Sequence, residues 1–309
     1  MKLDVLGLGA AAMDVVLNCQ DLPREDGFSF VQSEALVPGG SCANMLAALR
    51  GLGFSCGLAC KLGDDHYGRA FLTDLASLGV DTRGVRVKRG GVSLHTYITV
   101  AAKGVKAIFA HLGDSLLDLS AEEVDPVWLE EAGLFYTDLF PAAPALKLAR
   151  ECRRLGRPVV FNLQVPVDFM GACGVGREEI EEMLELADLF ISGAEALEEL
   201  TGQDQAAAGL QEVCQRHALS VGAVATLGEA GSLWLRHGEF IARPSLPVTA
   251  VDTTGAGDAF NAGLLDGLFL LKMPALKCLD LATACAALKC TQPGPRLSAT
   301  LEQVASLLV

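Results

Sequence analysis

The sequence predicts an α/β fold in three layers, with a mostly parallel central sheet between helices, and a small second sheet. Short apolar segments alternate with helical patterns along most of the 309 residues, which is typical of a parallel sheet covered on both faces. Two segments, at about residues 10–37 and 90–112, break this alternation, because strand-like stretches follow one another there without a helix. No internal repeat or long linker divides the chain. We therefore expect one domain over residues 1–309, with an accessory sheet inserted from those two segments.

The elements of the first half follow from apolar periodicity and from glycines. Residues 3–9 and 55–63 are apolar runs of strand length. Residues 41–53 and 67–79 carry helical patterns, and the second ends at Gly79, a residue type that commonly closes a helix. The accessory sheet is expected to contain antiparallel strands at residues 13–19, 28–36, 91–102 and 104–112.

The second half continues the alternation of strand and helix. Connections between successive parallel strands should be right-handed crossovers. Strands are predicted at residues 133–139, 158–163, 188–192, 221–227 and 232–235, and helices at 143–156, 177–187, 194–202 and 209–218.

Composition limits the classes of function. The net charge of −14 disfavours binding to nucleic acids or membrane surfaces, because both are polyanionic. The 10 cysteines form no CxxC pair and lie mostly in apolar segments, so we expect buried, reduced thiols and no zinc site. The N-terminus lacks a signal-peptide pattern, and no uncharged apolar run reaches about 18 residues. A cytoplasmic protein is expected.

Four glycine-containing motifs have structural as well as functional interpretations. GLGAAA matches a dinucleotide-binding fingerprint, but the sequence after it continues as strand instead of helix, which disfavours NAD. GGSCAN (39–44) fits a turn with Ser41 as helix N-cap, or a close backbone approach to a polar ligand. SGAE fits a capping box of Ser192 and Glu195 at the carboxyl edge of the sheet, where α/β sites lie. TLGEAG fits a hairpin turn, or donors that face a phosphate.

DTTGAGDAF carries the strongest signal. Gly255, Ala256 and Gly257 lead directly into a helix, and backbone N–H groups at a helix N-terminus favour an anion. Asp258 follows at once, so an acceptor for a proton would stand beside a bound phosphate, as phosphoryl transfer requires. No Gly-Lys dipeptide occurs in the chain, which excludes a Walker A loop.

Six motifs in order resemble those of the ribokinase-like (PfkB-type) carbohydrate kinase family. DTTGAGDAFNAG resembles the C-terminal signature of that family, and Gly9 with Asp14 resembles its early G-x-x-x-x-D. DLPREDG followed by VPGGSCANMLAALRGLG resembles the N-terminal signature region, and KLGDDHYG resembles G-x-D-x-x-G. TLGEAG resembles T-x-G-x-x-G, and ACAALKCTQPG resembles the segment around the adenine. The resemblance covers nearly the whole chain.

The resemblance implies ATP-dependent phosphorylation of a hydroxymethyl group under a β lid, with Mg²⁺ bridging the phosphates. It implies that Asp258 is the general base and that Gly255, Ala256 and Gly257 form the anion hole. Many members bind a monovalent cation such as K⁺, for which Asp252 and Thr254 are the expected ligands. The remaining implied site residues are Asp14, Gly39, Gly40, Asn44, His95 and Gln164 for the acceptor, Thr226, Gly228, Gly231 and Ser192 for the nucleotide, and Glu195 for Mg²⁺ through water.

Three positions depart from the family pattern. The family's Asn-x-x-Glu is Ser192-Gly193-Ala194-Glu195, and a serine replaces one hydrogen bond of the amide. The family's Asp-x-Asn is Asn162-Leu163-Gln164, which removes a carboxylate from near the metal or phosphates. SLHTY replaces a Thr-Gly of many sugar kinases, which places His95 on a half-exposed strand where it could touch substrate.

The acceptor stays open at this point. A small sugar or sugar derivative is the leading interpretation, and a nucleoside is the alternative within the same superfamily. A non-catalytic ligand-binding protein on this fold is a third interpretation, which the retention of Asp258 beside an intact GAG loop disfavours. The exposed edges of the accessory sheet suggest a homodimer that pairs through it.

Overall fold

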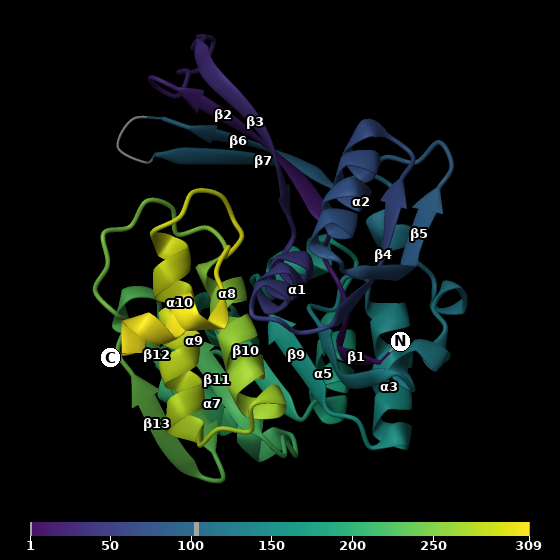
Figure 1. The fold of residues 1–309 in the computed structure, drawn as a ribbon, viewed down its shortest axis with the longest axis vertical. Helices are drawn as coiled ribbons and strands as arrows, with labels where there is room; N and C mark the ends of the chain where they lie inside the picture. The colour runs from purple at the N-terminus through teal and green to yellow at the C-terminus, as the bar shows by residue number, and fades with distance from the viewer. Residues whose placement is uncertain (1, 102–104, 309) are drawn as a thin grey trace.

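The computed structural model describes residues 2–101 and 105–308. Within them the chain forms a nine-stranded sheet in the order β13-β12-β11-β10-β9-β8-β1-β4-β5 (Figure 1). Neighbouring strands from β5 to β11 run parallel, whereas β12 pairs antiparallel with both β11 and β13. The predicted mostly parallel sheet is confirmed. The strands are β1 (Leu3–Leu8), β4 (Cys56–Gly63), β5 (Asp81–Lys88), β8 (Ala132–Thr137), β9 (Val159–Leu163), β10 (Leu189–Gly193), β11 (Gly222–Thr226), β12 (Ser232–Arg236) and β13 (Glu239–Arg243).

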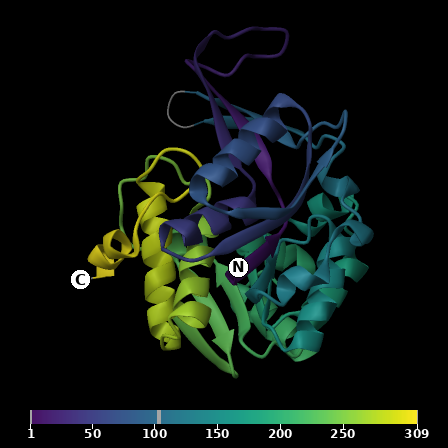
Figure 2. The same cartoon turned by 45° about the vertical axis from the view of Figure 1, so that its right-hand side comes forward.

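Helices cover both faces of this sheet (Figure 2). Successive strand residues face opposite sides, and apolar residues on each side pack against one layer of helices. Leu189 and Ile191 of β10 pack in a core with α1, α2, α8 and α9, whereas Phe190 packs in a second core with α3, α5, α6 and α7. The helices are α1 (Ser41–Gly51), α2 (His66–Leu78), α3 (Ala142–Leu155), α4 (Val167–Ala172), α5 (Arg177–Leu186), α6 (Ala194–Thr201), α7 (Ala206–Arg216), α8 (Ala256–Leu265), α9 (Ala275–Cys290) and α10 (Leu301–Ala305).

The accessory sheet stands at one end of the large sheet (Figure 1) and consists of β3 (Val31–Gly39), β2 (Ala12–Cys19), β6 (His95–Val100) and β7 (Lys106–His111), in that order. The prediction of antiparallel strands throughout is wrong at its centre, where β2 and β6 pair in parallel. Each is the outgoing strand of its own hairpin, so the two run in the same direction. The predicted strand at residues 28–36 begins only at Val31, and the predicted strand ends at residues 102 and 104 lie outside the described residues.

Two strands of the large sheet, β5 and β13, are absent from the sequence prediction. They are its two edge strands, and both carry charged side chains that hide the apolar pattern of a strand. The segment after β1 passes directly into β2 without a helix, as expected from the sequence beyond GLGAAA. No helix within residues 2–101 and 105–308 has both the length and the apolar character that crossing a membrane requires.

The predicted capping box of Ser192 and Glu195 is not formed. β10 continues through Ser192, and Gly193 precedes α6 without a side-chain cap. The Ser192 hydroxyl is buried and lies 3.2 Å from the carbonyl oxygen of Leu163 and 3.0 Å from that of Gly193. The Ser192 hydroxyl therefore bonds to backbone carbonyls of β9 and β10 instead of capping α6.

Candidate active site

The first turns of two helices meet at Asp258. The hydroxyl of Ser41 in α1 donates to Asp258 Oδ1 over 2.6 Å, and the amide of Asn44 donates to Oδ2 over 2.9 Å. Asn162 of β9 lies behind them, with its amide 3.4 Å from the Ser41 hydroxyl oxygen. The GGSCAN and GAGD motifs, more than 200 residues apart, thus form one hydrogen-bonded cluster.

Asp138, at the end of β8, holds the start of α1 in place. Its buried carboxylate accepts the backbone N–H of Ala10 at 3.0 Å and that of Cys42 at 3.2 Å. The predicted N-cap role of Ser41 is therefore wrong: Gly40 precedes the helix, and the side chain of Asp138 binds a first-turn N–H instead. This arrangement leaves the Ser41 hydroxyl free for Asp258.

Burial raises the pKa of both carboxyl groups. The pKa of Asp258 lies above its ordinary value because burial outweighs the hydrogen bonds from Ser41 and Asn44. The pKa of Asp138 rises to about 7, because burial outweighs its bonds to the backbone N–H groups of Ala10, Phe140 and Cys42. A carboxylate with a raised pKa is a better proton acceptor than an exposed aspartate.

The loop before α8 is shaped by Gly255 and open at Gly257. Gly255 has φ 76°, and a Cβ there would overlap the carbonyl oxygen of Pro295, so only glycine fits. A Cβ on Gly257 would meet no atom within 4 Å. The N–H groups of Gly257 and Asp258 belong to the first turn, where the helix offers no acceptor, so they remain free for an anion.

A groove of 660 Å³ extends from this loop along the β11–β12 hairpin. Residues of the TLGEAG motif and of the GAG loop both line this groove. Thr226, Gly228 and Gly231 contribute from the hairpin, and Ala256 and Gly257 from the start of α8. Its other walls are largely apolar and come from Leu246, Pro247, Val248, Ala250, Phe260, Ala286 and Ala287.

Two predicted nucleotide-side residues do not line the groove. Ser192 is buried beneath its end, where the Thr226 hydroxyl lies 3.4 Å from the Ser192 carbonyl oxygen. Glu195 lies exposed in the first turn of α6.

Asp14 lies on the other side of the cluster, on β2. Its carboxylate accepts a 2.6 Å hydrogen bond from the Thr96 hydroxyl of β6. A Cβ on Gly39 would overlap its second oxygen, so the glycine allows the carboxylate to lie against the backbone. Burial raises the pKa of Asp14, opposed by the Thr96 hydrogen bond and by the Arg296 charge. Gly40, with φ 90°, turns the chain from β3 into α1.

Arg296 connects this side of the cluster to Asn44. Its Nε donates to the Asn44 amide oxygen over 3.2 Å, and its guanidinium pairs with Asp74. Asn44 therefore uses its donor for Asp258 and its acceptor for Arg296, which fixes the orientation of its amide.

His95 and Gln164 lie apart from Asp258. His95 is 6% exposed, although the rest of its strand is partly exposed, as expected. It neighbours Thr96 in the strand and therefore faces away from Asp14, with its ring stacked on Tyr67 at 4.1 Å and on His111 at 4.6 Å. Gln164 follows β9, and its amide donates to Asp138 over 3.3 Å.

Asp252 and Thr254 lie together, beside two lysines. Thr254 donates to Asp252 through its N–H and its hydroxyl, at 3.0 and 2.8 Å. Lys106 of β7 donates to Asp252 Oδ1 and Thr254 Oγ1, and Lys289 of α9 donates to the Asp252 carbonyl oxygen.

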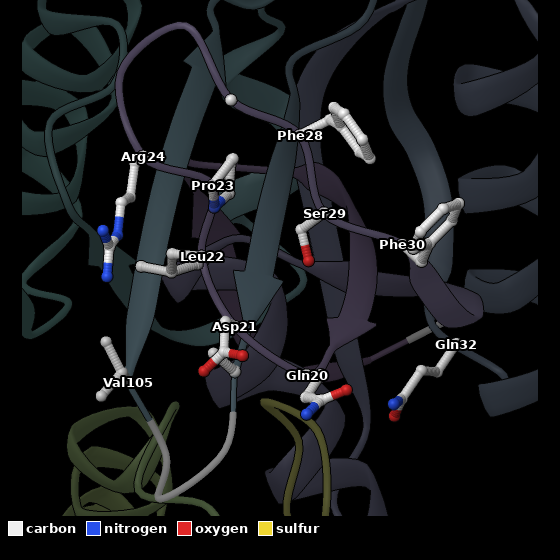
Figure 3. Close-up of a pocket in the computed structure, with 12 residues that line it drawn as sticks. Gln20, Asp21, Leu22, Pro23, Arg24, Phe28, Ser29, Phe30, Gln32 and Val105 are labelled. Carbon is white, nitrogen blue, oxygen red and sulfur yellow. The ribbon is translucent and has the colours of Figure 1, made fainter.

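A further hollow, of 720 Å³, lies at the loop between β2 and β3. Residues between 20 and 32 line it together with Ala101 and Val105, and Figure 3 shows Phe28 and Phe30 on one side of this loop. Neither α1 nor α8 contributes to it, so it is separate from the site at Asp258.

Comparison with known proteins gives the family. The model of the pfkB family carbohydrate kinases matches residues 2–302. The chain belongs to this family. It is similar to the ATP-dependent ribose-1-phosphate kinase of Halopiger xanaduensis, with 30% identity over 98% of this chain and 97% of the relative, and to the fructokinase of Klebsiella pneumoniae, with 29% identity over 83% of this chain and 87% of the relative.

Structural comparison agrees with the family assignment. The ribokinase of Arabidopsis thaliana, solved with ribose and ATP, superposes with a TM-score of 0.83, at 23% identity and over 100% of this chain and 99% of that one. The predicted ribokinase-like fold and the family resemblance are confirmed, and the chain is a kinase of the pfkB carbohydrate and nucleoside kinase superfamily.

Several residues around the site escaped the sequence prediction. Asp138 directly follows a buried strand, as residues at the carboxyl edge of an α/β sheet do, and this signal could have marked it. Ser41 lies inside a motif already singled out, but its cap-like position suggested the wrong partner. Arg296, Lys106 and Lys289 carry no local signal, because their partners are distant in the chain.

The two loop glycines should differ in their effect on stability. We expect Gly255→Ala to lower the melting temperature by several degrees, because a Cβ would strike the Pro295 carbonyl at a positive φ. Gly257→Ala is the matched control and should melt like the wild type, since its Cβ enters open space. Equal melting temperatures for the two variants would contradict this account of the loop.

Proposed function

We propose that this kinase transfers the γ-phosphoryl group of ATP to a hydroxymethyl group of a small sugar or sugar derivative. The observation that carries the proposal is the position of Asp258. It lies at the start of α8, with the open helix N-terminus and the groove on one side and Asp14 and Asn44 on the other. A base between an anion site and a set of polar acceptor contacts is what phosphoryl transfer to an alcohol needs.

The groove suits a nucleotide. Its apolar walls fit an adenine, and Gly228 lines it near the GAG loop without a side chain. The Gly231 N–H donates to the Gly228 carbonyl and so holds the turn in shape. The relative from Halopiger xanaduensis is named as ATP-dependent, which supports ATP here. Mg²⁺ would bridge the phosphates and neutralise their charge, largely through water, and Glu195 is the proposed partner of that water. Ser192 would act only through the backbone, because its hydroxyl is buried.

The reaction follows from these positions. The acceptor oxygen attacks the γ-phosphorus. The bond between the γ-phosphorus and the β–γ bridging oxygen breaks and releases ADP, and the hydroxyl proton passes to the Asp258 carboxylate. The N–H groups of Gly257 and Asp258 would hold the charge of the moving phosphoryl group. Ser41 and Asn44 keep the carboxylate oriented toward the acceptor, and Asn44 is itself fixed by Arg296.

The acceptor would bind between Asp14 and Asn44. Asp14 Oδ1 accepts the hydrogen bond from Thr96, and Oδ2 lies beside Gly39. The carboxylate therefore still has an oxygen that can accept a sugar hydroxyl. Gly40 would bring backbone close to the acceptor. We omit His95 from the proposed contacts, since both ring faces are stacked, and we assign Gln164 to holding Asp138.

Replacement of the proposed base tests the function. We expect Asp258→Asn to lower kcat by ~10²–10⁴-fold, because it removes the proton acceptor and keeps the shape. Melting temperature and binding of a fluorescent ATP analogue should stay near wild type. Asp21→Asn, on an exposed loop, is the control. Turnover of the Asp258→Asn variant close to wild type would overturn the assignment of the base.

The pH dependence should reflect the environment of Asp258. The base must be ionised, and its pKa is raised, so kcat/KM should increase with pH through a value above that of an exposed aspartate. Ser41→Ala removes a hydrogen bond that lowers this pKa, so the acid limb should move to higher pH. Ser77→Ala on the exposed side of α2 should leave it in place. An unmoved limb in Ser41→Ala would argue against Asp258 as the titrating group.

An acceptor panel separates the substrate classes. ADP release should be measured with fructose, ribose, ribose 1-phosphate and adenosine. We expect a sugar or sugar phosphate to support the fastest turnover, and Asp14→Asn to raise the KM for that acceptor more than the KM for ATP. Preference for adenosine would instead assign the chain to the nucleoside kinases of the superfamily.

A further inference from the structure

Lys289 is completely buried, yet among the described residues its ammonium group bonds to no carboxylate. Its Nζ donates to the backbone carbonyl oxygens of Asp252 at 2.8 Å and Gln292 at 3.2 Å. A lysine in the last turn of a helix is favoured by the helix dipole, but a surface lysine would serve equally well. Burial lowers the pKa of Lys289, and the Asp252 carboxylate opposes that shift. Burying a charge is costly, so the position must provide something beyond a helix end.

Lys106 reaches the same segment from the accessory sheet. Its Nζ lies 2.9 Å from Asp252 Oδ1 and 3.0 Å from Thr254 Oγ1. Burial would raise the pKa of Asp252, but hydrogen bonds from Thr254 and Lys106 outweigh it and lower the pKa to about 2. Lys106 and Thr254 together therefore occupy Asp252 Oδ1.

The oxygens of Asp252 are all engaged by this chain's own groups. Oδ1 binds Lys106 and Thr254, Oδ2 accepts the N–H of Gly294 at 3.1 Å, and the carbonyl oxygen accepts Lys289. A K⁺ ion bound to Asp252 and Thr254 would have to displace the Lys106 ammonium or lie beside it, and like charges in contact repel. These residues therefore do not fit a resident monovalent cation.

The two lysines hold the segment that leads into the anion loop. The N–H groups of Val251 and Asp252 donate to the Cys290 carbonyl at 2.7 and 3.2 Å, so this segment is attached to the end of α9. Gly255 follows three residues after Asp252 and packs on Pro295. Fixing Asp252 thus fixes where the N-terminus of α8 begins.

We propose that the ammonium groups of Lys289 and Lys106 replace the monovalent cation, so that phosphoryl transfer by this kinase does not require K⁺. Lys289 is the positioning residue within the core, and Lys106 adds a connection between the accessory sheet and the anion loop. The inference rests on the proposed role of the loop at Gly255–Gly257.

The first test uses the wild-type protein. Turnover with ATP, Mg²⁺ and the accepted sugar is measured without K⁺, and then with KCl replacing tetramethylammonium chloride at constant ionic strength. We expect a change below about twofold, where a cation-dependent catalyst would change about tenfold or more. Activation of the wild type about tenfold or more by K⁺ would overturn the proposal.

The second test creates the dependence. Lys289→Ala opens space beside the two carbonyl oxygens and should lower kcat about tenfold or more without K⁺, with recovery on adding K⁺ or ammonium. Its melting temperature, without nucleotide, should rise with KCl, whereas that of the wild type should not. Lys277→Ala is the matched control, since it lies on the same helix with its ammonium exposed beside Asp280. A folded Lys289→Ala variant that no cation restores would overturn the proposal.

A second variant keeps the test decisive if Lys289→Ala does not fold. Lys106 is partly exposed on an edge strand, so Lys106→Met should fold, and it should acquire activation by K⁺ of about twofold or more. If Lys106→Met turns over as fast as the wild type and K⁺ does not change its rate, the proposal is contradicted. Absence of ADP release from the wild type with every acceptor of the panel would remove the proposed function itself, whereas K⁺ activation of the wild type would remove only the replacement by lysine.

Discussion

The buried carboxylate of Asp138 is the constraint on which the site depends. Burying an ionisable group is unfavourable unless hydrogen bonds compensate for lost hydration, and here the N–H groups of Ala10, Cys42 and Phe140 provide them. One side chain thereby connects the exit of β1, the start of α1 and the end of β8. Because Asp138 caps α1, the Ser41 hydroxyl is left to orient Asp258.

The order of the sheet explains why the groups converge. β1, β8, β9, β10 and β11 are successive parallel neighbours, so their carboxyl ends open on one edge, where ligands of such sheets bind. The helices α1 and α8 both begin there, and their dipoles add positive potential around Asp258. The accessory sheet contributes Asp14, Thr96 and Lys106 near the same edge.

Local pattern predicted the buried strands, most helices and the turn at Gly255–Gly257 that leads into α8, because apolar periodicity and the Gly-Ala-Gly turn are encoded within a few residues. It failed where a distant group decides. Ser41 resembles an N-cap in the sequence, but the side chain of Asp138, which follows β8, accepts the first-turn N–H instead. For Asp252 and Thr254 the sequence gives no sign that Lys106 of β7 bonds to both side chains. The edge strands β5 and β13 failed for another reason, since solvent-facing charges mask their periodicity.

The charge distribution reconciles an acidic chain with an anionic nucleotide. The net charge of −14 would repel ATP at long range, yet salt screens surface charges beyond about 10 Å. Charges away from solvent are screened less. Lys289 is buried, Arg296 is largely buried and Lys106 is partly exposed, and the three lie around Asp258 and the loop before it, with two helix N-termini. The same cations hold Asp252 and Asn44 in place. The positions of these cations around Asp258 therefore matter more for binding ATP than the net charge of the whole chain.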